Sequence, residues 1–238
     1  MSDTRKQDTP TTAERLSSFL GNHRKFLLIL GTVLVVGIFA AVVIFQVVDN
    51  RMEQAAREAE LLVQDWERWT ATAKEGEDST SDLQDLESSI RTRAEGILAD
   101  YSRSYGALRA LQVLTQLEWK LDNYAAARDR SLEITERFPR SHLVGTALAN
   151  AAAASEELGD VDEARSFLDR IVAGEGAPTA EKARALFNLG RLSELEEQPS
   201  RALQYYNRLV DDHPDSNWTN LGRNRIIWLT SQGVRADT

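Results

Sequence analysis

The longest run of apolar positions stands near the N-terminus. Residues 26–48 read FLLILGTVLVVGIFAAVVIFQVV and contain no charged residue. As a helix, this run spans about 34 Å, which is enough to cross a hydrocarbon core of about 30 Å. The run is longer than the apolar part of a signal peptide, and no small-residue cleavage site follows it. The pattern predicts an uncleaved transmembrane helix over residues 26–48.

The charges on the two sides of this segment predict its orientation. Residues 1–25 carry five basic and three acidic residues, whereas the first fifteen residues after the segment carry only Arg51 and Arg57 as basic residues. Basic flanks stay in the cytoplasm. We therefore expect a single-pass protein of the bacterial inner (cytoplasmic) membrane, with a cytoplasmic N-terminus and a periplasmic C-terminal part.

Beyond the membrane segment, no stretch of alternating apolar and polar residues is long enough to predict a strand. Instead, a pattern of helix ends recurs. The segments ILADYSRS, ITERFPRS and LVDDHPDS superpose and end at Ser104, Ser141 and Ser216. Between them, a short polar turn followed by an alanine also recurs, and these alanines are 37 and 38 residues apart. Such self-similarity indicates a helical repeat.

The recurring pattern resembles the tetratricopeptide repeat, which has Leu-Gly in its first helix, Ala-x3-aromatic in its second and Pro at the end. The third copy matches best, whereas the first copy has Thr115 and Ser131 at the glycine and aromatic positions. The second copy lacks the terminal proline. The residues assigned to the repeat signature are Ala127, Pro139, Ala152, Ala164, Leu189, Gly190, Ala202, Tyr206 and Pro214.

These patterns predict an all-α chain in which a single N-terminal transmembrane helix precedes a tetratricopeptide-like α-solenoid of about nine helices. Small residues would let paired helices approach, and terminal elements would cap the array. The expected parts are a cytoplasmic tail over 1–25, the transmembrane helix over 26–48, a helical linker with a degenerate leading helix pair over 49–104, three repeats over 105–216, and a capping helix and tail over 217–238.

The composition excludes several classes of function. The 238 residues include 37 acidic and 28 basic ones, a formal net charge of −9, which argues against nucleic acid as a partner. The excess is larger after the tail, where 34 acidic face 23 basic residues. Cysteine is absent, and no nucleophile elbow, Walker loop or zinc-protease motif occurs. We expect neither catalysis nor a metal or cofactor.

The segment YGALRALQVL, residues 105–114, narrows the resemblance further. It is similar to the segment that opens the repeat region of the YfgM-type ancillary subunits of the Sec translocon, which also have a short cytoplasmic tail, one N-terminal membrane helix and a periplasmic tetratricopeptide domain. The resemblance implies a non-enzymatic adaptor whose partners are translocon subunits, envelope chaperones and unfolded secretory clients.

A second resemblance stays open. Pro139 and Pro214 are each followed two residues later by serine. This feature is similar to repeat proteins of outer-membrane protein assembly and envelope coordination. Those proteins usually begin with a lipobox or a cleaved signal, neither of which this sequence shows. The alternative role is therefore a scaffold that organises the envelope, outer-membrane assembly or cell division.

The repeat resemblance also implies a binding groove, because the first helices of such arrays line the concave face. We expect arginines to hold carboxylates of an extended peptide, with Trp119 and Phe187 either anchoring it or packing inside the array. A carboxylate clamp for chaperone C-termini is not reproduced, since Gln112 and Gln116 occupy two of its places. The expected groove residues are Arg109, Gln112, Gln116, Trp119, Glu156, Arg184, Phe187, Arg191 and Glu194, with Thr146, Ala149 and Ala153 beside them.

Overall fold

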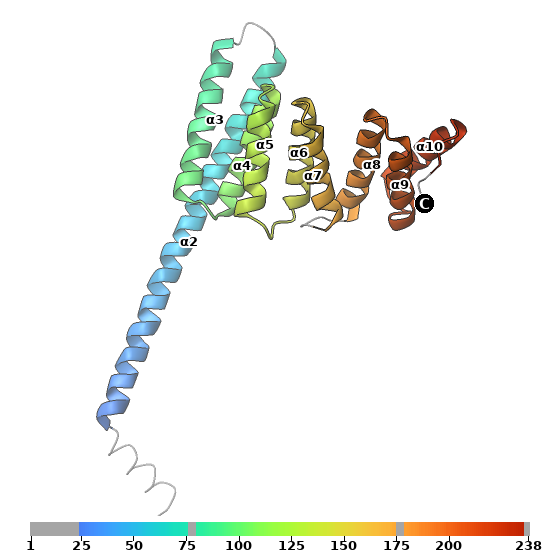
Figure 1. The fold of residues 1–238 in the computed structure, drawn as a ribbon. Coiled ribbons are helices and arrows are strands. Elements are labelled where there is room, and N and C mark those ends of the chain that lie inside the picture. The colour runs from blue at the N-terminus through green and yellow to red at the C-terminus, as the bar shows by residue number, and fades with distance from the viewer. Residues whose placement is uncertain (1–23, 76–79, 175–178, 236–238) are drawn as a thin grey trace, which may run out of the picture. The chain divides into compact units, whose positions relative to one another are not determined.

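The computed structural model describes residues 24–75, 80–174 and 179–235, and the described chain is built from α-helices without a strand (Figure 1). The predicted all-α class is confirmed. The predicted cytoplasmic tail lies outside the described residues except for its last two. The helices are α2 (Arg24–Glu75), α3 (Thr80–Asp100), α4 (Tyr105–Lys120), α5 (Tyr124–Arg137), α6 (Val144–Glu157), α7 (Val161–Val172), α8 (Thr179–Leu195), α9 (Pro199–Asp212) and α10 (Asn217–Ser231).

The chain divides into two units, Met1–Arg51 and Met52–Thr238. In the first unit, the described part of α2 exposes Phe26 and the large apolar side chains from Leu28 to Val48. The only hydroxyl in this run is satisfied locally, because Thr32 Oγ1 donates to the Leu28 carbonyl at 2.9 Å. This helix is long and apolar enough to cross a membrane.

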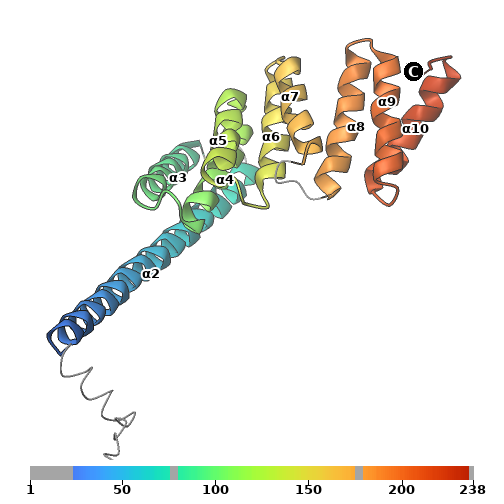
Figure 2. The same ribbon diagram turned by 60° about the horizontal axis from the view of Figure 1, so that its bottom comes forward.

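In the second unit, each helix from α3 to α10 packs against the next one in the chain. Figure 1 and Figure 2 show α4 with α5, α6 with α7 and α8 with α9 as three consecutive antiparallel pairs. Among the first helices, α8 packs against α6, and it also packs against α10. One face of the array is therefore formed by first helices, with α10 in the place where a fourth pair would begin.

The serine at each repeat end starts the next helix. Ser104 accepts a hydrogen bond from Ala107 N at 3.0 Å, and Ser216 accepts one from Trp218 N at 3.3 Å. Ser141 similarly accepts from Leu143 N at 3.2 Å, just before α6. Each side chain satisfies one of the backbone donors that a helix start leaves free. The recurring serine thus helps to set the residue at which the next helix begins.

Each pair fills the space between its two helices with a different combination of sizes. A Cβ atom added to Gly190 would lie 2.5 Å from the buried ring of Tyr206, so this place in the third pair requires glycine. The second pair has alanine opposite leucine, and the first has threonine and serine, all of them buried. From the third pair to the first, the first-helix residue grows while the second-helix residue shrinks. The combinations are Gly190 with Tyr206, Ala152 with Leu168, and Thr115 with Ser131.

The C-terminal part of α2 belongs to the same array. Its buried Leu62 and Trp69 join Ile90 of α3 and Leu111 of α4 in one hydrophobic cluster. Closer to the membrane segment, a Cβ atom added to Gly106 would lie 2.4 Å from a backbone oxygen of α2. The glycine lets the start of α4 touch that backbone. Together, α2 and α3 form a helix pair in front of the three repeats.

Candidate functional site

On the face formed by first helices, a residue in the last turn of one first helix pairs with a residue of the following first helix at the two later junctions. At the junction of α6 with α8 these two residues are Glu156 and Arg191, and at the junction of α8 with α10 they are Glu194 and Arg225. The residues of α4 and α6 that correspond to Glu156 and Arg191 are Trp119 and Ala153.

The two later junctions are closed by ion pairs. Arg191 donates to Glu156, and Arg225 donates to Glu194, with its Nε 3.0 Å from Glu194 Oε1. The Tyr206 hydroxyl donates to the same carboxylate at 2.6 Å. Burial opposes ionisation of Glu194, but the hydrogen bonds from Arg225 and Tyr206 outweigh it and lower the pKa of the carboxyl. These carboxylates and arginines neutralise one another.

The junction between α4 and α6 is open instead. A pocket of about 300 Å³ lies there, bounded by Trp119 on one side and Ala153 on the other. A second hollow of about 110 Å³ continues it and shares Thr115, Gln116 and Asn150 as lining residues. The pocket is lined by Trp66, Thr115, Gln116, Trp119, Lys120, Asn150, Ala153 and Arg184. We call these two connected hollows the α4–α6 groove.

The structure brings together six of the residues expected in or beside a groove. Gln116, Trp119, Ala153 and Arg184 line the larger pocket, and Gln112 and Thr146 line the smaller one. Arg109 is half-buried on α4 and lines neither hollow. Ala149 is buried in α6. The other expected residues lie at the later junctions, where Glu156, Arg191 and Glu194 are held in ion pairs and Phe187 packs against other rings.

Trp119 and Phe187, which the sequence left as either peptide anchors or packing residues, have different surroundings in the structure. The ring of Phe187 lies between Tyr206, at 5.6 Å between centroids, and Trp218, at 5.3 Å. It therefore packs inside the array. The indole of Trp119 borders the open pocket, and its position is fixed by an edge contact with Tyr124 at 5.2 Å.

The groove also contains residues that the sequence pattern did not indicate. Trp66 reaches it from α2, which lies outside the three recognised repeats, and stacks on Trp69 at 5.3 Å between centroids. Lys120 is the last residue of α4, and Asn150 lies in α6 between two expected positions. A search that treated the helix before the first repeat as part of the array would have found Trp66.

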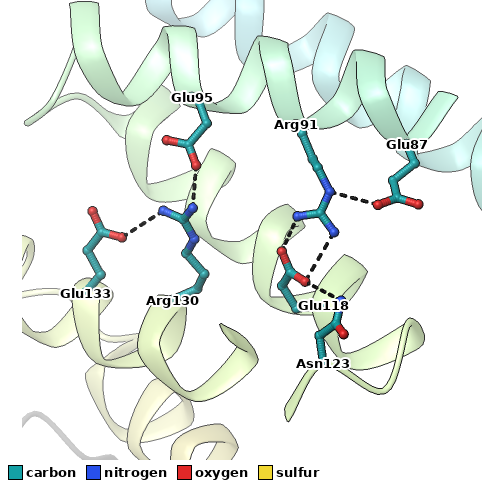
Figure 3. A network of polar contacts seen from close by, with 7 residues as sticks. All are labelled: Glu87, Arg91, Glu95, Glu118, Asn123, Arg130 and Glu133. Atoms are coloured by element: carbon teal, nitrogen blue, oxygen red, sulfur yellow. Dashed lines mark hydrogen bonds and ion pairs between the residues drawn. The ribbon is translucent and has the colours of Figure 1, made fainter. Parts of the chain in front are cut away.

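A polar network holds the end of α4 that carries Trp119 and Lys120 (Figure 3). Glu118 is buried and accepts hydrogen bonds from Arg91 of α3 and, at 3.0 Å, from the Asn123 amide in the following turn. Burial raises the pKa of Glu118, but these hydrogen bonds more than offset it, and the pKa is lowered overall. The carboxylate thus ties α3, α4 and the turn before α5 together behind the groove.

The same network continues to α5. Arg130 of α5 donates to Glu95 of α3 and, at 3.3 Å, to Glu133 on its own helix, as Figure 3 shows. Arg91 also binds Glu87 at 2.8 Å. The first pair is therefore joined to α3 by charged hydrogen bonds at two separate places, and each carboxylate has an arginine partner.

The groove offers chemistry for binding a chain. Its walls combine two indoles with amide and hydroxyl groups that can donate to and accept from a peptide backbone. No histidine or carboxylate lines either hollow. Among the described residues, no group of three or more histidine and acidic side chains is placed to hold a metal ion.

Comparison with known proteins agrees with the repeat pattern. A tetratricopeptide repeat is found over residues 184–216, the third pair of the array. The chain is also 34% identical over 97 residues to a TPR repeat-containing protein of Treponema pallidum (strain Nichols). That match covers 41% of this chain and 40% of the relative. The predicted fold, one apolar N-terminal helix followed by a tetratricopeptide solenoid, is confirmed, and such arrays serve as scaffolds for protein–protein interaction.

Proposed function

We propose that the protein is a membrane-anchored scaffold that binds segments of other proteins in the α4–α6 groove. The observation that carries this proposal is the open junction between Trp119 and Ala153, because the two later junctions of the same face are closed by ion pairs. The protein acts by binding, without catalysis, cofactor or metal. Its partners are proteins, not nucleic acid, and one helix holds it in the membrane.

The membrane arrangement is part of the proposal. Residues 1–25 form the cytoplasmic tail, residues 26–48 cross the bacterial inner membrane, and the array from residue 49 onward is periplasmic. The excess of basic residues before the apolar segment supports this orientation. The excess of acidic residues after it suits a soluble exported surface.

The more specific role is that of an ancillary translocon subunit. In this role the groove receives secreted clients as they emerge and brings them to envelope chaperones. Two features support it, namely the resemblance of residues 105–114 to YfgM-type proteins and the joining of a membrane helix to a repeat array in one chain. The Pro-x-Ser helix ends at Pro139 and Pro214 favour the alternative, a scaffold for outer-membrane assembly or cell division.

Photo-crosslinking in living cells tests the binding role. A photoreactive residue replaces Gln116, which is exposed inside the groove, and the matched control replaces Glu136, which is exposed on the second helix α5. We expect protein adducts at position 116 and few at position 136. Channel subunits or envelope chaperones among the adducts would support the translocon role, whereas assembly or division proteins would support the alternative. Equal yields at both positions would contradict a groove function.

The absence of cysteine makes the orientation directly measurable. In cells whose outer membrane has been permeabilised, a membrane-impermeant maleimide should label Gln116→Cys. The same reagent should label Ser17→Cys in the tail only after the inner membrane is broken. Labelling of Ser17→Cys in intact spheroplasts would reverse the proposed topology.

A further inference from the structure

The charges around the α4–α6 groove point to the chemistry of its partner. The charged residues that line the larger pocket are Lys120 and Arg184, and both are cations. Among the described residues, neither forms a hydrogen bond or an ion pair, whereas Arg191 and Arg225 of the closed junctions are both paired. The groove therefore presents two free positive charges.

These charges contrast with the rest of the exported part. From residue 49 onward the chain has 34 acidic and 23 basic residues. At physiological ionic strength the Debye length is about 8 Å, so the distant acidic surface is screened while charges inside the groove act on a bound group directly. A segment with carboxylates is thus complementary to the groove, and a basic segment is repelled there although the protein as a whole would attract it.

Two aromatic side chains, Trp66 and Trp119, line the same pocket as Lys120 and Arg184. Trp66 is held against Trp69 and Trp119 against Tyr124, so both indoles are oriented before a partner arrives. The space between them, about 300 Å³, is large enough for a bulky apolar side chain. Gln116 of α4 and Asn150 of α6 also line the pocket and can pair with the backbone on either side of that residue.

We propose that the α4–α6 groove selects an acidic segment of a partner protein that carries a bulky apolar residue. The apolar side chain enters between Trp66 and Trp119, and neighbouring carboxylates reach Lys120 and Arg184. This inference rests on the proposed binding function of the same groove. The closed junctions with Arg191 and Arg225 take no part in the selection.

Fluorine NMR of the full chain in detergent micelles, labelled with 5-fluorotryptophan, tests the selection. The probe is the acetylated, amidated heptapeptide Gly-Asp-Glu-Phe-Asp-Glu-Gly, and its control has lysine at all four acidic places. We expect the acidic peptide to shift the Trp66 and Trp119 signals with saturation. The lysine peptide should bind at least about tenfold more weakly, as the loss of two ion pairs and new repulsion imply.

Charge reversal provides the second arm. The double variant Lys120→Glu, Arg184→Glu breaks no hydrogen bond or ion pair within the described chain and should prefer the lysine peptide. Equal affinity of the native chain for both peptides, or shifts confined to Trp218 and Trp228, would overturn the inference. If neither peptide binds up to millimolar concentration the acidic–apolar chemistry is also wrong. The crosslinking at position 116 would then still decide the binding function independently.

Discussion

Between α6 and α8, and again between α8 and α10, a glutamate in one first helix pairs with an arginine in the next, whereas Trp119 and Ala153 hold these places between α4 and α6. The first two junctions share one register, whereas Arg225 stands about one helical turn earlier in α10 than the repeat pattern would place it, and it still closes its junction. An open groove is therefore a property of particular residues and does not follow from the repeat fold.

The buried residues of the third pair and the first pair also differ. The third pair has Gly190 against the ring of Tyr206, which in turn binds Glu194, so its core and its closed junction are connected. The first pair has Thr115 and Ser131 in the places of Gly190 and Tyr206, and Thr115 lines the groove. The third pair thus buries the ring of Tyr206 in its core, while in the first pair the indole of Trp119 lies at the surface of a pocket.

The largest effect is expected from Gly190→Ala. Its new Cβ would lie 2.5 Å from the ring of Tyr206, which is buried and cannot move aside without disturbing Phe187. We expect the free energy of unfolding to fall by about 2 to 3 kcal/mol. Chemical denaturation of the full chain in detergent micelles, followed by tryptophan fluorescence, measures the loss.

The matched control for this prediction is Gly96→Ala. Gly96 is exposed in α3, and a Cβ atom there would have no neighbour within 4 Å. This variant should keep its stability or gain up to about 1 kcal/mol, because alanine favours the helix more than glycine does. Equal losses from the two variants would show that close packing does not distinguish the third pair.

A smaller effect is expected from Glu118→Gln behind the open groove. The amide keeps the shape but loses the charged hydrogen bonds from Arg91, so the free energy of unfolding should fall by about 2 kcal/mol at pH 7. The folded protein lowers the pKa of Glu118, so this stabilisation is complete above the unfolded value of about 4.3 and is lost as the pH falls through the lower folded value. The native chain and the variant should therefore converge in acid.

Denaturation at a series of pH values between 7 and 3 measures this convergence. The control is Asp212→Asn, which removes an ion pair with Arg208 in which both side chains are about half exposed. That change should alter stability by less than about 1 kcal/mol at any pH, because exposed pairs contribute little. A difference between Glu118→Gln and the native chain that stays constant with pH would contradict a role for the carboxylate charge.

The sequence was sufficient to predict the repeat fold, because its signals are local. Alanine spacing, helix-ending prolines and small residues in first helices depend on neighbours within one pair. The position of the apolar N-terminal helix followed from composition alone. Thr115 and Ser131 depart from the pattern, yet both are buried, and each hydroxyl donates to a carbonyl of its own helix.

The groove could be predicted only in part, because it depends on contacts between pairs. Gln116, Trp119 and Arg184 were found from the register. The same register also selected Arg191, whose charge is matched by Glu156 on the preceding first helix. Trp66 was not found, since no repeat signature marks α2. Which side chains remain free is a property of neighbouring pairs and needs their placement in space.

Transplanting the closed junction onto the open one tests the comparison directly. The double variant Trp119→Glu, Ala153→Arg places an acid and an arginine at the register of Glu156 and Arg191. We expect the two changes together to be more stable than the sum of the single variants by about 0.5 to 1 kcal/mol, since the new charges can pair. The groove should close, and crosslinking from position 116 should fall to the level of position 136. Full crosslinking in a folded double variant would show that binding does not need the open junction.

The smallest effect is expected from Arg191→Ala at a closed junction. The Arg191 side chain is 38% exposed and that of Glu156 is 22% exposed, so solvent screens much of their attraction. The loss in the free energy of unfolding should be about 0.5 kcal/mol and should shrink further in 1 M salt. Because Arg191 lines neither hollow, crosslinking from position 116 should keep its native yield in the same variant. A clear fall in that yield would mean that the bound segment also contacts the α6–α8 junction at Arg191, and the division between one open junction and two closed ones would then be wrong.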